Sequence, residues 1–278
     1  MITIDATIRH ALEISGDDLI LTLDPALQGL PETAHGGSVL AVFDALAGAT
    51  GPRELTGLYR RRVPLGVPLT LKRAREDSAE TFVLCDQSDG VLVDGRVVPA
   101  GLPHPSPRDG NDAERHPLPI SRTCFACGTD NELGLRAQLE FDAGAVRGAW
   151  QPRAPFRRPD GTLAPAALTT LLDEAAFWLG ALATGESGMT TELCVSLHEP
   201  APFDAPVTVE GGRAAVRPRG EDPRYQDTEI VAHAGGRLVA TARITFVAVR
   251  GAARRLVGGM LAINDPACVR RVFPAYTR

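Results

Sequence analysis

One pattern occurs twice along this 278-residue chain, and it limits the folds that the chain can adopt. In each occurrence, a long apolar segment with helical periodicity is followed by several short segments with the periodicity of strands. The predicted helices span 35–48 and 165–182. The matched positions are Asp44 with Asp173 at an offset of 129, then Glu54 with Glu192 and Pro68 with Pro206 at an offset of 138. A constant offset with a single insertion after the helix indicates a duplicated unit.

Strand-like segments lie on both sides of each predicted helix. Before the first helix, Ile2, Ile4 and Ile8 alternate with polar residues, and before the second we expect strands at 135–141 and 146–150. After the helices, we expect strands at 54–59, 68–71, 81–85 and 91–98, and then at 190–197, 206–209, 227–232 and 237–249. Each unit is therefore predicted to be α+β, an antiparallel sheet wrapped around a central helix. Because such a sheet leaves one edge and one helix stripe uncovered, we expect the two units to pair as a pseudo-dimer.

A proline-rich segment at 99–119 separates the two units. Its prolines prevent a helix or a central strand from running through it. We therefore expect an N-terminal unit at 1–98, a linker at 99–119, a C-terminal unit at 120–250 and a tail at 251–278.

Composition excludes several classes of protein. The chain is 44% hydrophobic and 23% charged, so it can bury a core, and its net charge of −5 argues against a nucleic-acid-binding protein. No apolar run approaches the roughly 20 residues that cross a bilayer, and the N-terminus lacks the basic segment of a signal peptide. Five cysteines without such a signal predict reduced thiols. We expect a cytoplasmic protein that neither spans nor binds a membrane.

The first predicted helix begins with His35-Gly36-Gly37, and Asp44 follows the histidine by nine positions. Backbone N–H groups in the first turn of a helix have no intrahelical partner, and glycine lets a ligand approach them closely. Such groups can stabilise negative charge that develops on a bound carbonyl oxygen. Taken alone, the same three residues more often mark a turn that starts a helix.

Two segments of the second half strengthen the functional interpretation: Cys124-Phe-Ala-Cys-Gly-Thr-Asp-Asn-Glu-Leu-Gly-Leu135 and Leu171-Leu-Asp-Glu-Ala-Ala176. Together with the first motif, they resemble the hotdog-fold acyl-CoA thioesterases, in particular the phenylacetate-pathway type. The resemblance covers both halves and implies two tandem hotdog units. It also implies that the glycine N–H after the histidine polarises a thioester carbonyl. A helix aspartate would act as nucleophile or general base, assisted by a Ser or Thr on the following strand.

Transferred to this chain, the resemblance assigns the carbonyl-binding role to His35, Gly36 and Gly37. Nine residues of helix span about 13 Å, so Asp44 lies too far along its own helix to deliver water to a carbonyl at Gly36. The catalytic carboxylate is therefore expected from the other helix.

The second helix supplies two candidates for that carboxylate, Asp173 and its neighbour Glu174. Adjacent helix residues point about 100° apart, so we expect only one of them to face the site. Thr190 takes the hydroxyl position that the resemblance implies. The alternative is that Asp44, Asp173 and Glu174 are ordinary solvated helix positions.

The mirror-related site is predicted to be degenerate. It would combine Asp44 with Ala164 and Pro165, and proline has no N–H to donate to an oxyanion. Pro52 occupies its hydroxyl position and supplies no hydroxyl. One complete site per chain is therefore expected.

Several residues are candidates for contacts with the substrate. Gln28 is a candidate for the amide that the resemblance implies before the histidine, although Gly29 occupies the expected position. Guanidinium groups suit the phosphates of coenzyme A, which makes Arg60, Arg61 and Arg62 candidates, as are Arg157 and Arg158 more weakly. Phe177 and Trp178 are candidates for an acyl pocket. The plainer interpretations are a solvated charged face for the arginines and a protein core for the aromatic residues.

Cys124 and Cys127 have the spacing of half a zinc site or a redox pair. Structural zinc needs four ligands, and no second pair of cysteines or histidines has suitable spacing. We therefore predict no metal and assign this segment to a structural turn.

These observations predict a thioesterase that hydrolyses acyl-CoA or an acyl-carrier thioester, with no cofactor other than the CoA of the substrate. The main alternative is a non-catalytic acyl-CoA-binding or regulatory protein on the same fold. A hotdog dehydratase or hydratase is a lesser alternative. The acyl chain and the oligomeric state stay open, a homodimer of double-hotdog chains being one option.

Overall fold

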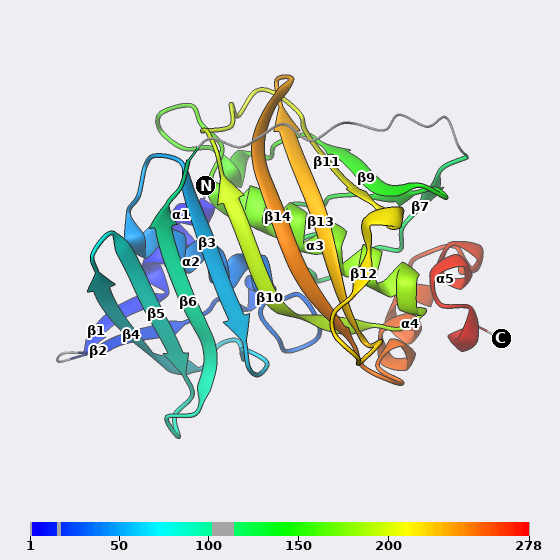
Figure 1. Ribbon diagram of the computed structural model, residues 1–278, viewed down its shortest axis with the longest axis horizontal. Helices are drawn as coiled ribbons and strands as arrows, with labels where there is room; N and C mark the ends of the chain where they lie inside the picture. Colours follow the sequence, from blue (N-terminus) through cyan, green and yellow to red (C-terminus); the bar gives the residue numbers. More distant parts are fainter. Residues whose placement is uncertain (1, 16–17, 102–113, 278) are drawn as a thin grey trace.

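The computed structural model describes residues 2–15, 18–101 and 114–277. Within these residues, the strands form one antiparallel sheet of 14 strands that runs through both halves of the chain (Figure 1). Its order is β1-β2-β4-β5-β6-β3-β10-β14-β13-β11-β9-β8-β7, and β12 pairs with β13 outside this path. The two long helices, α2 and α3, cover one face of the sheet. This face, with the helices on it, holds the core.

The elements of the N-terminal half are α1 (Ile4–His10), β1 (Leu12–Ser15), β2 (Asp18–Thr22), η1 (Pro25–Leu27), α2 (Gly36–Ala47), β3 (Arg53–Tyr59), β4 (Pro68–Glu76), β5 (Ala79–Cys85) and β6 (Val91–Pro99). Those of the C-terminal half begin with β7 (His116–Pro117), β8 (Glu140–Phe141), β9 (Ala145–Trp150), η2 (Ala154–Phe156) and α3 (Pro165–Thr184). They continue with β10 (Gly188–Leu197), β11 (Val207–Gly212), η3 (Arg213–Ala215), β12 (Arg217–Pro218), β13 (Tyr225–Ala234), β14 (Arg237–Ala248), α4 (Ala253–Leu261), α5 (Pro266–Val272) and η4 (Pro274–Tyr276).

The two halves join where β3 pairs with β10. Leu55 of β3 lies opposite Val195 of β10, and both side chains are fully buried. Because each strand was the open edge of its own half, this pairing satisfies backbone groups that would otherwise remain exposed. It also places the N-terminus of α2 beside the middle of α3.

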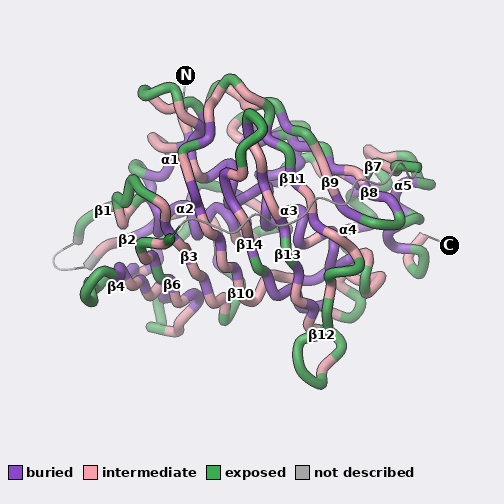
Figure 2. Tube along the Cα trace, turned by 45° about the horizontal axis from the view of Figure 1, so that its top comes forward, coloured by how far each residue is buried: buried purple, intermediate pink, exposed green. Residues whose placement is uncertain are grey.

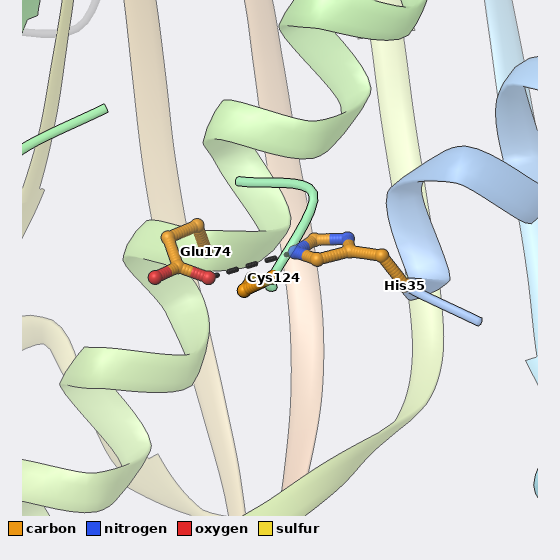
Figure 3. A group of neighbouring side chains, drawn as sticks. All are labelled: His35, Cys124 and Glu174. Carbon is orange, nitrogen blue, oxygen red and sulfur yellow. Dashed lines mark ion pairs between the residues drawn. The ribbon is translucent and has the colours of Figure 1, made fainter. Parts of the chain in front are cut away.

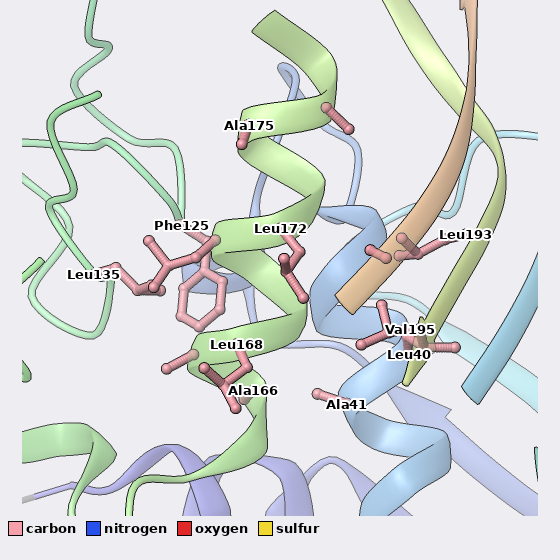
Figure 4. Packing of buried hydrophobic residues seen from close by; sticks show 14 of the residues in the cluster. Leu40, Ala41, Phe125, Leu135, Ala166, Leu168, Leu172, Ala175, Leu193 and Val195 are labelled. Atoms are coloured by element: carbon pink, nitrogen blue, oxygen red, sulfur yellow. The ribbon is translucent and has the colours of Figure 1, made fainter. Parts of the chain in front are cut away.

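Helices α2 and α3 pack against each other over the junction (Figure 4). Leu40 of α2 and Leu172 of α3 are fully buried there, above Leu193 and Val195 of β10. Each such side chain contributes about 1.5–3 kcal/mol through burial. Figure 2 shows the buried residues concentrated along these helices and the strands beneath them.

A close approach of backbones fixes the relative position of the two helices. A Cβ atom on Gly37 would lie 2.4 Å from the carbonyl oxygen of Thr169, so only glycine fits there. The Thr169 hydroxyl donates a hydrogen bond of 2.7 Å to the Gly37 carbonyl.

Helix α3 is long and apolar enough to span a membrane by length and composition, but 83% of its most apolar window is buried inside the fold.

Both predicted helices and the eight strands expected after them are confirmed, with ends that shift by a few residues. The expected strand around Ile4 and Ile8 is wrong: these residues lie on α1. Side chains four positions apart share one face of a helix, and Thr3 caps this helix by accepting a hydrogen bond from the Ala6 N–H. The strand expected at 135–141 is formed only at its end, as β8.

The proposed linker lies partly outside the described residues, since 102–113 are not described. Within the range that is described, Pro99 ends β6 and His116–Pro117 form the short edge strand β7. The tail, for which no structure was expected, forms α4 and α5. Their apolar sides, including Val257 and Val269, are buried against the C-terminal half.

Candidate active site

The site is built where α2 begins. His35 is the N-cap of this helix, and Gly36 and Gly37 form its first turn. Among the described residues, none accepts a hydrogen bond from the Gly36 N–H. A Cβ atom on Gly36 would lie 2.7 Å from the Asp173 carboxylate, so glycine at this position lets the carboxylate of α3 reach the start of α2. The structure thus leaves an N–H donor free beside a carboxylate from the other half.

Asp173 is the most densely bonded side chain of the site. Its Oδ2 accepts a hydrogen bond of 2.9 Å from the Gly37 N–H and lies 3.1 Å from His35 Nδ1. Its Oδ1 accepts a hydrogen bond of 2.6 Å from the Thr190 hydroxyl. The side chain is only 6% exposed, so these contacts replace water almost completely. The carboxylate is held rigidly with its oxygens oriented by neighbours.

Glu174 also faces the site, which corrects the expectation that only one of the two acidic neighbours would. Its Oε2 lies 3.5 Å from His35 Nε2, and its Oε1 accepts a hydrogen bond of 2.9 Å from the Trp178 indole. The imidazole of His35 lies between the helix residues and presents one nitrogen to each carboxylate. Asp173 and Glu174 point in different directions from α3, but the His35 ring is large enough to contact both. The angle between adjacent helix residues did not predict this shared contact.

His35 and Asp173 shift each other's pKa in opposite directions. Burial alone would lower the pKa of His35, but the charge of Asp173 and hydrogen bonds with Asp173 and Glu174 raise it well above 6.5. Burial would raise the pKa of Asp173. The charge of His35 and the hydrogen bonds from His35, Thr190 and the Gly37 N–H outweigh burial and lower this pKa below 3.8. The lowered pKa leaves Asp173 ionised at neutral pH.

An irregularity in β10 positions Thr190. The register with β14 shifts between Thr190 and Glu192, which is the mark of a β-bulge. Thr190 is thereby directed to Asp173, while the hydroxyl of its neighbour Thr191 donates to the Thr245 carbonyl. A bulge commonly turns a side chain out of the regular alternation next to a functional site.

A cavity of about 310 Å³ opens beside these residues. Its walls come from the start of α2, the middle of α3, β10 and the loop after β3. Phe177 and Trp178 line it, and so do Leu256 and Met260 of α4. The aromatic residues predicted for a pocket therefore do reach one, although Trp178 is also 98% buried core, with 2% exposure.

The three consecutive arginines also line this cavity. Arg60 and Arg61 are paired with Asp94 and Asp86 at 2.9 Å each. Arg62 is exposed, contacts the Met189 sulfur at 3.4 Å, and is not paired with any carboxylate of the described residues. Arg62 therefore has the guanidinium most available to a ligand. Arg157 stacks over Phe203 and Arg158 pairs with Asp5, both away from the cavity.

Gln28 does not line the cavity, contrary to the prediction from its sequence position. Its Nε2 donates to the Thr123 hydroxyl at 2.6 Å, and its Oε1 accepts from the Glu32 N–H at 3.1 Å. These bonds tie the loop before α2 to the segment that contains the cysteines, and they hold the amide away from the pocket. Gly29, at the position that the resemblance implies for an amide, lines the cavity instead.

The mirror-related site, predicted from Asp44, Ala164 and Pro165, has different contacts. Asp44 forms a buried two-point ion pair with Arg53, in which Arg53 Nη2 lies 2.8 Å from Asp44 Oδ2. Pro165 lines a smaller cavity of about 110 Å³, and Arg53 lines it too. Ala164 is the N-cap of α3 and makes no side-chain capping bond. Here the carboxylate is neutralised by an arginine, whereas Asp173 meets a hydroxyl and an imidazole.

Two further cavity residues were not singled out as functional from the sequence. The Tyr59 hydroxyl donates a hydrogen bond of 2.6 Å to the Gly36 carbonyl, and burial, then Asp173, raise the pKa of this phenol well above 10. Cys124 enters the same cavity from the segment before β8. In the sequence, Tyr59 is recognisable only as the last residue of a predicted strand, next to the three arginines. That position does not indicate a function until the fold places it beside Gly36.

No protein-family model and no curated protein matches this sequence. Several solved structures are similar to the structure of this chain. A protein of Thermobifida fusca proposed to be a thioesterase II is 18% identical, with a TM-score of 0.59, and the match covers 88% of this chain and 99% of that one. A protein of Alicyclobacillus acidocaldarius with a hot dog fold is 14% identical, with a TM-score of 0.59, over 88% and 97%. The chain has the hotdog fold.

Other structures on this fold carry different activities. The acyl-CoA thioesterase II TesB2 of Mycobacterium marinum is 14% identical, with a TM-score of 0.54, over 88% of this chain and 98% of that one. The CurJ dehydratase is 13% identical, with a TM-score of 0.56, over 86% and 94%. Since both thioesterases and a dehydratase resemble this hotdog chain at low identity, its activity must be argued from its own site.

Proposed function

We propose that this protein is a thioesterase built from two tandem hotdog units, paired as a pseudo-dimer with one active site. The observation that carries the proposal is the Asp173 carboxylate beside the free Gly36 N–H. An N–H donor at a helix start suits an oxyanion, and a buried ionised carboxylate next to it suits the activation of water. Named thioesterases among the similar structures support the same activity.

In the proposed reaction, the thioester carbonyl accepts a hydrogen bond from the Gly36 N–H. A water molecule attacks the carbonyl carbon while Asp173 takes its proton, and Thr190 holds the carboxylate in place. The resulting oxyanion is stabilised by the Gly36 N–H and the positive end of α2. The carbon–sulfur bond then breaks, and the departing thiolate takes the proton that Asp173 removed from water, so that the products are a free acid and a thiol and Asp173 is again ionised. Glu174 is the alternative base.

The proposed substrate is acyl-CoA or an acyl-carrier thioester. Phosphates at the cavity mouth would meet Arg62 first, and the acyl chain would contact Phe177 and Trp178. No cofactor beyond the CoA of the substrate is proposed for this reaction. The cytoplasm is the proposed location.

The test is release of free thiol from short, long and aromatic acyl-CoA esters. Asp173→Asn is expected to lower turnover by roughly 10²–10⁴-fold, the usual contribution of a general base. Asp44→Asn leaves Arg53 without its buried partner, so it is expected to lower the melting temperature but to keep most of the turnover of folded protein. A dead Asp44→Asn enzyme with an active Asp173→Asn enzyme would contradict the assignment across the halves.

The CurJ likeness makes a dehydratase the second candidate. It is tested on the same preparation by following hydration of an enoyl thioester alongside thiol release. Hydration without thiol release would replace the proposal, whereas saturable binding of acyl-CoA without either reaction would indicate a binding or regulatory protein.

A further inference from the structure

The cysteine segment lies closer to the site than its sequence position suggested. Cys124 is 6% exposed and lines the cavity together with His35 and Glu174. One atom from each of these three residues, Cys124 Sγ, an imidazole nitrogen and a carboxylate oxygen, lies within 4.8 Å of the others (Figure 3). The three side chains come from three separate segments and converge on one point.

Two of these groups are oriented by a second layer of hydrogen bonds. His35 turns Nδ1 to Asp173 at 3.1 Å, which directs Nε2 to Glu174 and the space beside Cys124. The Trp178 indole holds Oε1 of Glu174 at 2.9 Å, which leaves Oε2 facing inward. A carboxylate on the far nitrogen of a histidine and a donor on the far oxygen of a carboxylate are the usual supports of metal ligands.

The sulfur of Cys124 is oriented by hydrogen bonds within its own turn. Its sulfur accepts a hydrogen bond of 3.3 Å from the Ala126 N–H. The Cys127 thiol is a second hydrogen-bond partner of the Cys124 side chain. Both partners arise from the tight turn at Gly128, whose N–H bonds to the Cys124 carbonyl at 2.8 Å. A thiolate is the form of cysteine that binds metal.

We propose that His35 Nε2, Cys124 Sγ and Glu174 Oε2 bind a thiophilic divalent cation of the Zn²⁺ class. Zinc prefers nitrogen, sulfur and oxygen ligands at about 2.0–2.3 Å in a tetrahedron, whose edges are then roughly 3.3–3.8 Å. The 3.5 Å between His35 Nε2 and Glu174 Oε2 already falls in this range, and the Cys124 sulfur lies within 4.8 Å of a ligand atom of each of the other two residues. Three protein ligands leave the fourth position open toward the cavity, as in zinc sites that bind an exchangeable ligand.

The spacing of residues along the chain predicted no metal, because the three ligands come from segments that are distant in the sequence. His35 and Glu174 are far from Cys124 in sequence and have no spacing that a motif would include. The inference does not rest on the proposed thioesterase activity, since it concerns only how these ligands are placed.

The test uses Co²⁺ as a spectroscopic substitute for Zn²⁺ in the full-length, chelator-treated protein. We expect one equivalent of Co²⁺ to produce a thiolate-to-cobalt charge-transfer band and the visible bands of a tetrahedral site, and one equivalent of Zn²⁺ to remove them. Cys124→Ser should abolish the charge-transfer band. The matched control is Cys194→Ser, on β10 and away from the cavity, which should keep it.

Two further variants test the other ligand and its support. Glu174→Gln is expected to weaken Co²⁺ binding at least 10-fold, and Trp178→Phe, which removes the supporting donor together with part of a buried ring, by about 10–100-fold in protein that still folds. They keep the proposal testable if Cys124→Ser does not fold, which thermal melts will show. Absence of the band in the unmodified protein, or its persistence in folded Cys124→Ser, would overturn the proposal. Neither result bears on thiol release.

Discussion

At the scale of single residues, the site depends on two glycines that admit other groups. Gly36 leaves room for the Asp173 carboxylate, and Gly37 leaves room for the backbone of α3 at Thr169. Both therefore act by the absence of a side chain, one for the chemistry of the site and the other for the distance between helices. The contact between His35 and Asp173 depends on the same close packing of α2 and α3, because the two side chains reach each other only at this separation.

Gly37→Ala tests the close approach. Its Cβ would lie 2.4 Å from a backbone oxygen, so we expect a loss of about 1–3 kcal/mol in the free energy of unfolding, measured by denaturant titration. The matched control is Gly258→Ala within α4, where a Cβ meets nothing within 4 Å. This control is expected to be neutral or to stabilise by up to about 1 kcal/mol. Equal effects of both substitutions would contradict the packing argument.

His198 gives a prediction for pH, outside the active site. It follows β10, is 5% exposed, and bonds through Nε2 to the Thr241 hydroxyl at 3.1 Å. Burial lowers the pKa of His198 below 6.5, although the charge of Glu199 opposes this. Below pH 6.5 the unfolded chain therefore binds a proton that the folded protein resists, and stability falls as pH decreases toward the folded pKa.

The measurement is the free energy of unfolding between pH 7.5 and 5 for the unmodified protein and His198→Gln, a range chosen to bracket the ordinary histidine pKa of about 6.5. Below pH 6.5, we expect the free energy of unfolding of the unmodified protein to fall by up to about 1.4 kcal/mol for each pH unit as the contribution of His198. This contribution should be absent from the His198→Gln variant. A slope that is identical in both proteins would show that His198 does not titrate on unfolding.

At the scale of elements, the β-bulge of β10 and the tail helix α4 shape the site more than any regular strand does. The bulge turns Thr190 toward α3, and α4 supplies Leu256 and Met260 to a cavity wall. Both elements depart from the regular pattern of long strands packed under a helix. They contribute to the difference between the two halves, because the corresponding region of the first half presents Arg53 to Asp44.

Thr190→Val, with Thr191→Val as its neighbour control, tests the bulge. The first removes a hydrogen bond of 2.6 Å to an ionised carboxylate, and such bonds are worth about 1.5–3 kcal/mol. We expect turnover in thiol release to fall roughly 10- to 150-fold, the equivalent of that energy. Thr191→Val removes a bond to a carbonyl on β14 and should leave turnover within about twofold of the unmodified rate if the protein folds normally. The reverse order of effects would show that the bulge does not direct Thr190 to the site.

At the scale of the whole molecule, the two halves share one sheet and one continuous core. The β3–β10 pairing, the packing of α2 on α3 and the cross-half bonds of Asp173 all pass through the same region. Neither half could separate without exposing the faces of both helices and breaking the pairing. The molecule is therefore expected to unfold as a unit.

This expectation has a direct readout, since Trp150 and Trp178 both belong to the second half and the sequence holds two tryptophans. In equilibrium unfolding by urea, tryptophan fluorescence reports that half, whereas far-ultraviolet circular dichroism reports both. We expect the two curves to coincide with a single midpoint. A fluorescence transition displaced from the circular-dichroism transition would show that the halves unfold separately.

Much of the architecture could be predicted from the sequence. The apolar spacing of α2 and α3 and the alternation of the following strands depend on neighbours in the chain, so local periodicity is enough to find them. The same local information misled at Ile4 and Ile8, whose spacing of four also fits a helix. It gave no hint that the tail helices would pack on the core.

The site was predictable only in part. Comparing the halves pointed to Asp173 rather than Asp44, because a proline in one copy and a glycine in the other can be seen in the sequence. The meeting of Glu174 and Cys124 on His35, beside the predicted Asp173, was decided by tertiary structure alone. Groups from distant segments are brought within bonding distance by the β3–β10 pairing and the helix contact at Gly37, and no local pattern encodes the distance between them.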